Sequence, residues 1–219
     1  MGYKIAIDGP AGAGKSTIAK RVAKEKGFIY VDTGAMYRGL AVHFLRRGIQ
    51  PEEAEKIADA CRDAEITIGY EGGVQQIYLN GDNITADLRK EAVGNMASVS
   101  SALPEVRDKL LELQRQLARS KDVVMDGRDI GTHVLPDADI KVFLTASVKT
   151  RAKRRYDELK EKGGADISYS EVEKDIIARD ERDMNRSVAP LKQAVDAVRI
   201  DSSEMFKEEV VEAILKLCR

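Results

Sequence analysis

The sequence predicts an α/β protein with a parallel five-stranded sheet flanked by helices. Short apolar segments typical of buried strands recur along the 219 residues, at positions 3–8, 28–32, 123–126, 140–146 and 197–200. Segments with helical spacing of apolar residues lie between them, which is the arrangement that parallel strands require. Hydrophobic residues make up 43% of the chain, enough for one substantial core, and the 17 glycines and 5 prolines exclude a low-complexity or collagen-like chain.

The helices follow from apolar spacing and from the residues at their ends. Gly27 and Gly48 are expected to end the first two helices, and Pro51 is expected to be the first residue of the third. The pattern predicts helices at residues 15–27, 36–47, 51–64, 88–101, 104–120, 149–162, 170–185 and 204–217.

The sequence pattern changes at residues 66–85, where it predicts a small antiparallel sheet. Strand-like pieces at residues 66–69, 74–79 and 84–85 are joined by Gly72-Gly73 and by Asn80-Gly81. An Asn-Gly pair is a strong hairpin signal because both residues tolerate positive φ. We therefore expect an insert that folds apart from the main sheet.

Composition excludes several classes of function. The chain has 36 basic and 37 acidic residues, and this near-balance argues against nucleic-acid binding. No stretch approaches the ~20 apolar residues of a membrane span, and the N-terminal residues lack a secretory signal. Cys61 and Cys218 are too few for a disulfide framework. We expect a cytoplasmic monomer with free thiols and no membrane or nucleic-acid partner.

Residues 9–16, GPAGAGKS, match the pattern G-x-x-x-x-G-K-[ST] of a phosphate-binding P-loop. The match lies after a predicted strand and at the start of a predicted helix, where backbone N–H groups and the positive end of the helix meet a phosphate. Lys15 is expected to neutralise the β- and γ-phosphates of ATP, Ser16 to bind Mg²⁺, and Thr17 to contact the α-phosphate. The fold class is therefore of the P-loop NTPase type.

Asp126 ends the predicted VVMD strand and is a second candidate for the metal site. It could orient Mg²⁺ directly or through water. The same strand could instead serve to direct Arg128 and Asp129 into the site, and the sequence leaves both roles open.

Arginines are the other candidates for chemistry. Residues 151–186 carry equal numbers of acidic and basic side chains, so this segment is no nucleic-acid tail. Arg179, Arg182 and Arg186, with Asp183, fall on roughly one face if a single helix continues through them. Either the helix is solvent-exposed with i,i+4 ion pairs, or the segment is a mobile lid with Gly163-Gly164 as its tip, bringing guanidinium groups onto a transferring phosphoryl group.

Five segments occur in order across nearly the whole chain: GPAGAGKST, DTGAMYR, SSALPEVR, DGRDIGT and RDERDMNRSVAPL. Together they resemble the bacterial-type cytidylate kinases, nucleoside monophosphate (NMP) kinases that phosphorylate CMP and dCMP with ATP and Mg²⁺. The resemblance implies a P-loop core at 1–35, 86–148 and 187–219, an NMP-binding region with the antiparallel insert at 36–85, and a helical lid at 149–186.

The resemblance also implies roles for individual residues. Lys15, Arg128, Arg179 and Arg186 would be catalytic. The ATP phosphates would be held by the P-loop residues Gly9, Pro10, Ala11, Gly12, Ala13, Gly14, Lys15, Ser16 and Thr17.

On the acceptor side, the resemblance implies three groups of CMP contacts. Arg38, Arg128 and Arg186 would clamp the phosphate, Arg179 and Asp183 would meet the sugar, and Ser98, Arg107 and Asp129 would read the cytosine edge. Thr33 stands where many members of the family carry serine, and it keeps the hydroxyl.

The chemistry independently suits this interpretation. An acceptor phosphate has its second pKa near 6, so it needs no general base at neutral pH. Catalysis then requires positioning and charge neutralisation, which arginines supply. Two other classes remain open: a P-loop kinase acting on a hydroxyl such as that of shikimate, with Asp32 or Asp129 as base, and a nucleotide-binding regulatory module without turnover.

Overall fold

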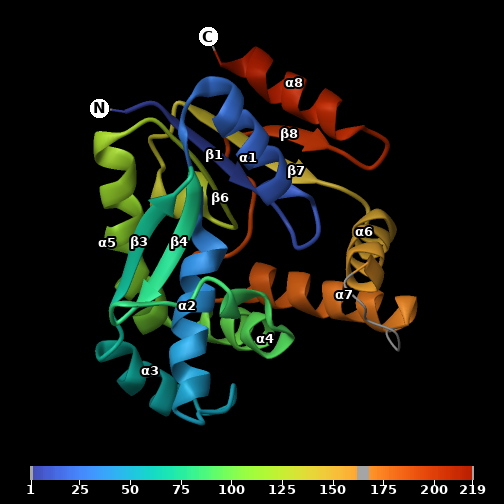
Figure 1. The fold of residues 1–219 in the computed structure, drawn as a ribbon. Helices are drawn as coiled ribbons and strands as arrows, with labels where there is room; N and C mark the ends of the chain where they lie inside the picture. Colours follow the sequence, from blue (N-terminus) through green and yellow to red (C-terminus); the bar gives the residue numbers. More distant parts are fainter. Residues whose placement is uncertain (1, 162–167, 219) are drawn as a thin grey trace.

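The structure is a computed structural model and describes residues 2–161 and 168–218. The predicted lid tip Gly163-Gly164 lies outside the described residues. The five expected strands form one parallel sheet in the order β2-β6-β1-β7-β8. Their bounds are β1 Lys4–Asp8, β2 Ile29–Asp32, β6 Val123–Gly127, β7 Ile140–Thr145 and β8 Val198–Asp201. The predicted parallel α/β architecture is confirmed (Figure 1).

Side chains of the buried strands point alternately to the two faces of this sheet, and helices cover both faces. Ile5 and Ile7 of β1 pack with α1 (Lys15–Lys26) and α8 (Lys207–Leu217). Ala6, which points to the opposite face, packs in a second cluster with α5 (Pro104–Ser120). The carboxyl ends of β1 and β6 lie side by side in this layered arrangement, with Asp8 paired in register with Gly127.

The insert is a three-stranded antiparallel sheet of β3 (Ile66–Glu71), β4 (Val74–Leu79) and β5 (Asp82–Asn83). Asn80 and Gly81 both take positive φ, 50° and 89°, as the hairpin signal predicted. The third strand comes earlier than expected, because residues 82–83 pair with β4 whereas Thr85 uses its hydroxyl to accept the N–H of Ile77 at 2.9 Å.

The helices around the insert differ from expectation at their starts. α2 (Thr33–Arg46) begins three residues before the predicted 36 because Asp32 caps it, its carboxylate accepting the Ala35 N–H at 2.8 Å. Pro51 lies in a turn and is not a helical residue, since α3 (Ala54–Arg62) starts only after Glu53 has accepted the Gln50 N–H. The predicted helix at 88–101 divides into a 3-10 turn (Asp87–Arg89) and α4 (Glu91–Ser100).

Two helices form the predicted lid segment, α6 (Val148–Glu161) and α7 (Tyr169–Asn185). They pack on each other through a small cluster containing Ala152, Val172 and Ile176. The far end of α7 reaches α4 (Figure 1), so this helix lies across the carboxyl ends of the central strands. Among the described residues, no helix has both the length and the apolar composition to span a bilayer.

Candidate active site

The P-loop joins β1 to α1, as the motif predicted. Gly14 takes φ 87° immediately before α1 begins at Lys15, so the loop turns its amides toward the start of the helix. Lys15 is buried and its Nζ donates to the Pro10 carbonyl oxygen at 2.8 Å. Burial, reinforced by the charge of Arg128, lowers the pKa of this lysine to about 7. A bound polyanion would reverse that shift by stabilising the ammonium.

Asp126 lies beside Ser16 at the end of β6. The Ser16 hydroxyl donates to one carboxylate oxygen at 3.0 Å, and the Tyr30 hydroxyl donates to the other at 2.8 Å. Burial and the nearby charge of Asp32 raise the pKa of Asp126 to about 6. A hydroxyl and a carboxylate side by side are the hard oxygen ligands that Mg²⁺ prefers. Within the described parts of the chain, no cluster of three or more histidine, cysteine or acidic side chains forms a metal site by itself.

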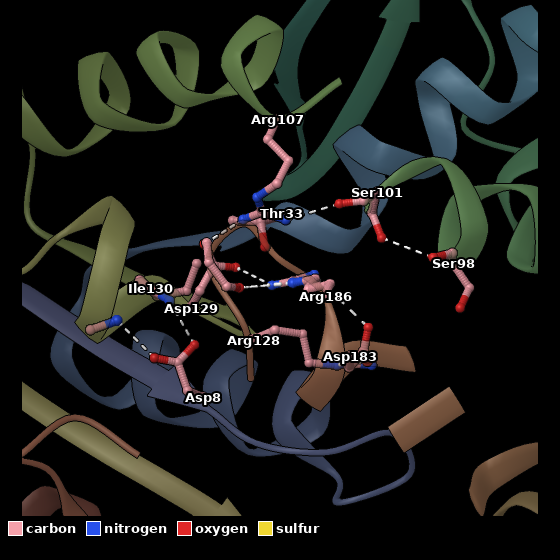
Figure 2. A network of polar contacts seen from close by, with 12 residues as sticks. Asp8, Thr33, Ser98, Ser101, Arg107, Arg128, Asp129, Ile130, Asp183 and Arg186 are labelled. Carbon is pink, nitrogen blue, oxygen red and sulfur yellow. Dashed lines mark hydrogen bonds and ion pairs between the residues drawn. The ribbon is translucent and has the colours of Figure 1, made fainter. Parts of the chain in front are cut away.

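The turn after β6 carries Arg128 and Asp129 and is fixed from below by Asp8. The two carboxylate oxygens of Asp8 accept the N–H groups of Ile130 and Gly131 at 2.8 and 2.7 Å (Figure 2). Burial raises the pKa of Asp8 to about 6, although the two N–H groups favour its ionised form. Asp8 thereby links the end of β1 to a five-residue π-helical turn, Ile130–Val134, that the sequence pattern did not predict.

Asp129 is the centre of a buried ion-pair network (Figure 2). One of its oxygens pairs with Arg107 from α5, and the other pairs with Arg186 at 3.0 Å. Arg186 also donates through Nε to the Ala189 carbonyl at 2.8 Å. Three distant segments therefore meet at one carboxylate.

Asp183 of α7 extends this network to Arg128. Its carboxylate accepts from Arg128 Nε at 2.8 Å and lies 3.9 Å from Arg186 Nη1. Burial alone would raise the pKa of Asp183, but the charges of Arg128 and Arg186 hold it below its usual value. The ion pair between Arg128 and Asp183 therefore joins the turn after β6 to α7.

Ser98 and Arg107, two of the residues predicted to read the cytosine edge, each carry a buried polar atom without a protein partner. The Ser98 hydroxyl and the Arg107 Nε are buried and have no hydrogen bond among the described residues. Other atoms hold both residues in place: Arg107 Nη1 donates to the Ser101 carbonyl at 3.3 Å, and the Ser101 hydroxyl donates to the Ser98 carbonyl at 3.0 Å. Buried polar atoms without a partner are costly and favour a ligand that pairs with them.

Thr33, Arg38 and Arg179 complete the predicted acceptor set. Thr33 donates to the Asp126 carbonyl at 2.7 Å, and Arg38 pairs with Asp32 at 3.0 Å. Arg179 is half-buried on α7, and its pKa is lowered to about 10 by burial and by the positive charges of Arg128 and Arg38. Arg38 and Arg128 therefore lie within electrostatic reach of Arg179.

The structure corrects one expectation for α7. Arg182 is exposed and joins no contact of this network, because Asp183 and Asp180 occupy the buried face of the helix. The helix ends at Asn185, as the predicted 170–185 helix does, so it does not continue through Arg186, whose ψ is an extended 143°. Four buried or partly buried residues that the pattern did not single out also support the site: Asp8, Tyr30, Arg151 and Asp180.

Comparison with known proteins identifies the family. A family model described as cytidylate kinase matches residues 5–219. The chain belongs to the cytidylate kinase family. A cytidylate kinase from Caldicellulosiruptor bescii is 47% identical over 213 residues, covering 97% of this chain and 94% of the relative. A cytidylate kinase from Desulfitobacterium hafniense is 50% identical over 214 residues, covering 98% and 91%.

Solved structures place this cytidylate kinase family member in a wider fold group. Shikimate kinase from Acinetobacter baumannii in complex with shikimate has a TM-score of 0.50 at 18% identity, covering 100% of this chain and 93% of the other. At that identity the likeness concerns the fold alone. It confirms the expected P-loop kinase architecture, while the family match confirms the resemblance drawn from the five motifs.

Proposed function

We propose that this member of the cytidylate kinase family transfers the γ-phosphoryl group of ATP to CMP or dCMP, yielding ADP and CDP or dCDP. The observation that carries the proposal is the convergence of the P-loop lysine with arginines from two other segments. Arg128 is close enough to lower the pKa of Lys15, and it pairs with the same Asp183 that approaches Arg186.

On the donor side, we assign the ATP phosphates to the P-loop amides and to Lys15. Mg²⁺ would be held by Ser16 and Asp126, directly or through water, together with phosphate oxygens. When bound, the ion neutralises charge on the donor phosphates. Tyr30 fixes the Asp126 carboxylate in place through its hydroxyl.

On the acceptor side, we assign the CMP phosphate to Arg38, Arg128 and Arg186. Arg179 and Asp183 are placed for the sugar. The cytosine edge offers an amino donor and two acceptors, and this pattern suits the Asp129 carboxylate together with the unpaired Ser98 hydroxyl and Arg107 Nε.

Catalysis needs no protein base in this scheme. The acceptor is a phosphate that is already ionised at neutral pH, so it attacks without losing a proton. The chain contributes in-line positioning and fixed positive charge from Lys15, Arg128, Arg179 and Arg186. The remaining expectations, action as a monomer in the cytoplasm without nucleic-acid or membrane partners, are part of the same proposal.

A coupled kinase assay with ATP and Mg²⁺ tests the proposal across four acceptors: CMP, dCMP, UMP and shikimate. We expect turnover of CMP and dCMP. Turnover of shikimate without CMP would overturn the assignment in favour of a hydroxyl kinase. Nucleotide binding without turnover of any acceptor would favour a regulatory module instead.

A further inference from the structure

A buried ion pair outside the proposed substrate contacts joins the lid to the P-loop. Arg151, near the start of α6, pairs through Nη1 with Asp180 of α7 at 2.6 Å, and the two side chains are only 5% and 10% exposed. Both partners also bind the backbone of one P-loop residue. Arg151 Nη1 donates to the Ala11 carbonyl at 2.9 Å, and Asp180 Oδ1 accepts the Ala11 N–H at 3.3 Å.

Packing at the next residue of the loop makes this attachment close. A Cβ added to Gly12 would lie 3.1 Å from the Arg151 Cβ and 3.5 Å from the Ile176 Cδ1 of α7. The helices therefore lie directly on the P-loop backbone. Arg151 is itself fixed to the core, since its Nε donates to the Ala146 carbonyl just beyond β7 at 2.9 Å.

The same helix reaches the acceptor side one turn later. Asp183 lies three residues after Asp180 and holds Arg128, and Arg186, directly after the helix, holds Asp129. Residues three apart share a helix face, so one face of α7 contacts both the donor loop and the turn that carries the acceptor arginines. Movement of α7 must shift both contacts together.

We propose that Arg151 and Asp180 are positioning residues that couple the ATP-binding loop to the arginines of the acceptor site through α7. This rests on the proposed function, because it takes the P-loop as the donor site and the Arg128 turn as part of the acceptor site. Occupation of one site then favours the arrangement of the other, and in-line geometry is set by the pair although it touches neither substrate.

The double variant Arg151→Met/Asp180→Leu tests this coupling. Replacing a buried ion pair by apolar side chains of similar volume preserves folding better than removing one partner, so loss of structure and loss of coupling are separable. The conservative Asp180→Asn variant keeps an oxygen for the Ala11 N–H and removes only the charge. The double variant Lys153→Ala/Asp157→Ala removes an exposed ion pair from the same helix α6 and is the control.

Titration calorimetry measures the dissociation constant of a nonhydrolysable ATP analogue with and without saturating CMP, and the readout is the factor between the two values. The kcat, KM and Tm of each variant are measured separately. We expect a factor on the order of 5–150 in the wild type and in the control. In Arg151→Met/Asp180→Leu it should fall to about 1, with kcat on the order of 10²-fold lower, as a small displacement of reactants predicts. Asp180→Asn should lie between.

Three results would overturn the coupling role. The first is an unchanged factor in Arg151→Met/Asp180→Leu. The second is a wild type whose two sites bind their ligands independently. The third is equal weakening of the binding of both ligands together with a lowered Tm, which would show that the pair has only a structural role. Phosphoryl transfer to CMP by the wild type is measured first. Its absence refutes the proposed function, whereas an active wild type with one of these three results refutes the coupling alone.

Discussion

Four arginines of the proposed acceptor site are each held by a carboxylate. Asp129 holds Arg107 and Arg186, Asp183 holds Arg128, and Asp32 holds Arg38. A guanidinium group that is already oriented loses less rotamer entropy when it binds a phosphate. Under the proposed function, these acids order the arginines and are not needed as proton acceptors.

Replacing Arg128 by alanine should lower kcat/KM for phosphoryl transfer on the order of 10²–10⁴-fold, because it removes a fixed charge beside the transferring group. Steady-state kinetics with ATP and CMP measure the effect. Arg182→Ala is the matched control on α7, since Arg182 is exposed. Equal activity of Arg128→Ala and the wild type would show that Arg128 has another role.

Lys15 should take up a proton when the nucleotide binds. In the free protein its pKa is about 7, so at pH 8 the amine is mostly neutral. A polyphosphate beside it raises that pKa, so binding at pH 8 draws a proton from the buffer, with up to about one proton expected. The uptake should shrink toward pH 6, where the lysine is already charged before binding.

Calorimetric titration of a nonhydrolysable ATP analogue with Mg²⁺, in buffers of different ionisation enthalpy, measures this uptake. Lys15→Arg is the control because arginine stays protonated throughout, so its uptake at pH 8 should be near zero. A wild type that binds the analogue at pH 8 without proton uptake would contradict the assignment of Lys15 to the phosphates.

At the residue scale, the sequence predicts a site best where the residues that form it are neighbours in the chain. The P-loop and the order of the motifs were read directly, because the glycines, Lys15 and Ser16 are neighbours in the chain. Asp8 was missed because its partner Ile130 lies 122 residues away. The expectation that Arg182 shares a face with Asp183 was wrong because adjacent helical residues point about 100° apart. Asp183 is buried and Arg182 is exposed.

At the scale of elements, two side chains of the insert attach it to the backbone of β2 in the main sheet. The amide of Gln75 on β4 accepts the Asp32 N–H at 2.8 Å and donates to the Asp32 carbonyl at 3.1 Å. The Tyr70 hydroxyl donates to the Tyr30 carbonyl at 3.1 Å. Because Asp32 also caps α2 and pairs with Arg38, the insert supports the acceptor site indirectly.

Gln75→Ala should lower the free energy of unfolding by about 1–3 kcal/mol, because the N–H and C=O of Asp32 lose their partners. It should also raise KM for CMP while leaving KM for ATP close to the wild-type value. Urea unfolding and steady-state kinetics measure the two effects. Gln76→Ala is the control, since the adjacent Gln76 is only half-buried and its hydrogen bonds to Val74 and Asn83 are exposed, so its loss should change stability by less than about 0.5 kcal/mol.

The types and order of the helices and strands could be predicted because the spacing of apolar residues agrees with the residues expected at element ends along most of the chain. The hairpin at Asn80-Gly81 and the helix at 104–120 are examples, the latter matching α5. The start of α3 was wrong because proline at a first helical position is a tendency, and here the Glu53 contact with Gln50 forms a turn first. The π-helical turn depends on Asp8 and could not follow from local pattern.

At the scale of the whole molecule, arginines on separate elements favour closure around an anion. Arg38, Arg128 and Arg179 come from different parts of the fold: α2, the turn after β6 and α7. A dianionic acceptor would attract all three guanidinium groups at once. Binding of the acceptor should therefore draw the insert and the lid helices over the sheet.

CMP should therefore make the molecule more compact and keep water from the transferring group. Small-angle scattering should show a smaller radius of gyration with CMP than without it, and cytidine, which lacks the phosphate, should have little effect because it cannot neutralise the arginines. ADP formation without an acceptor should be at least ~10²-fold slower than transfer to CMP, since closure around the acceptor phosphate excludes water from the transferring group. Rapid ATP hydrolysis without an acceptor, unchanged by CMP, would contradict closure as the source of selectivity, because water would then reach the transferring group whether or not an acceptor is bound.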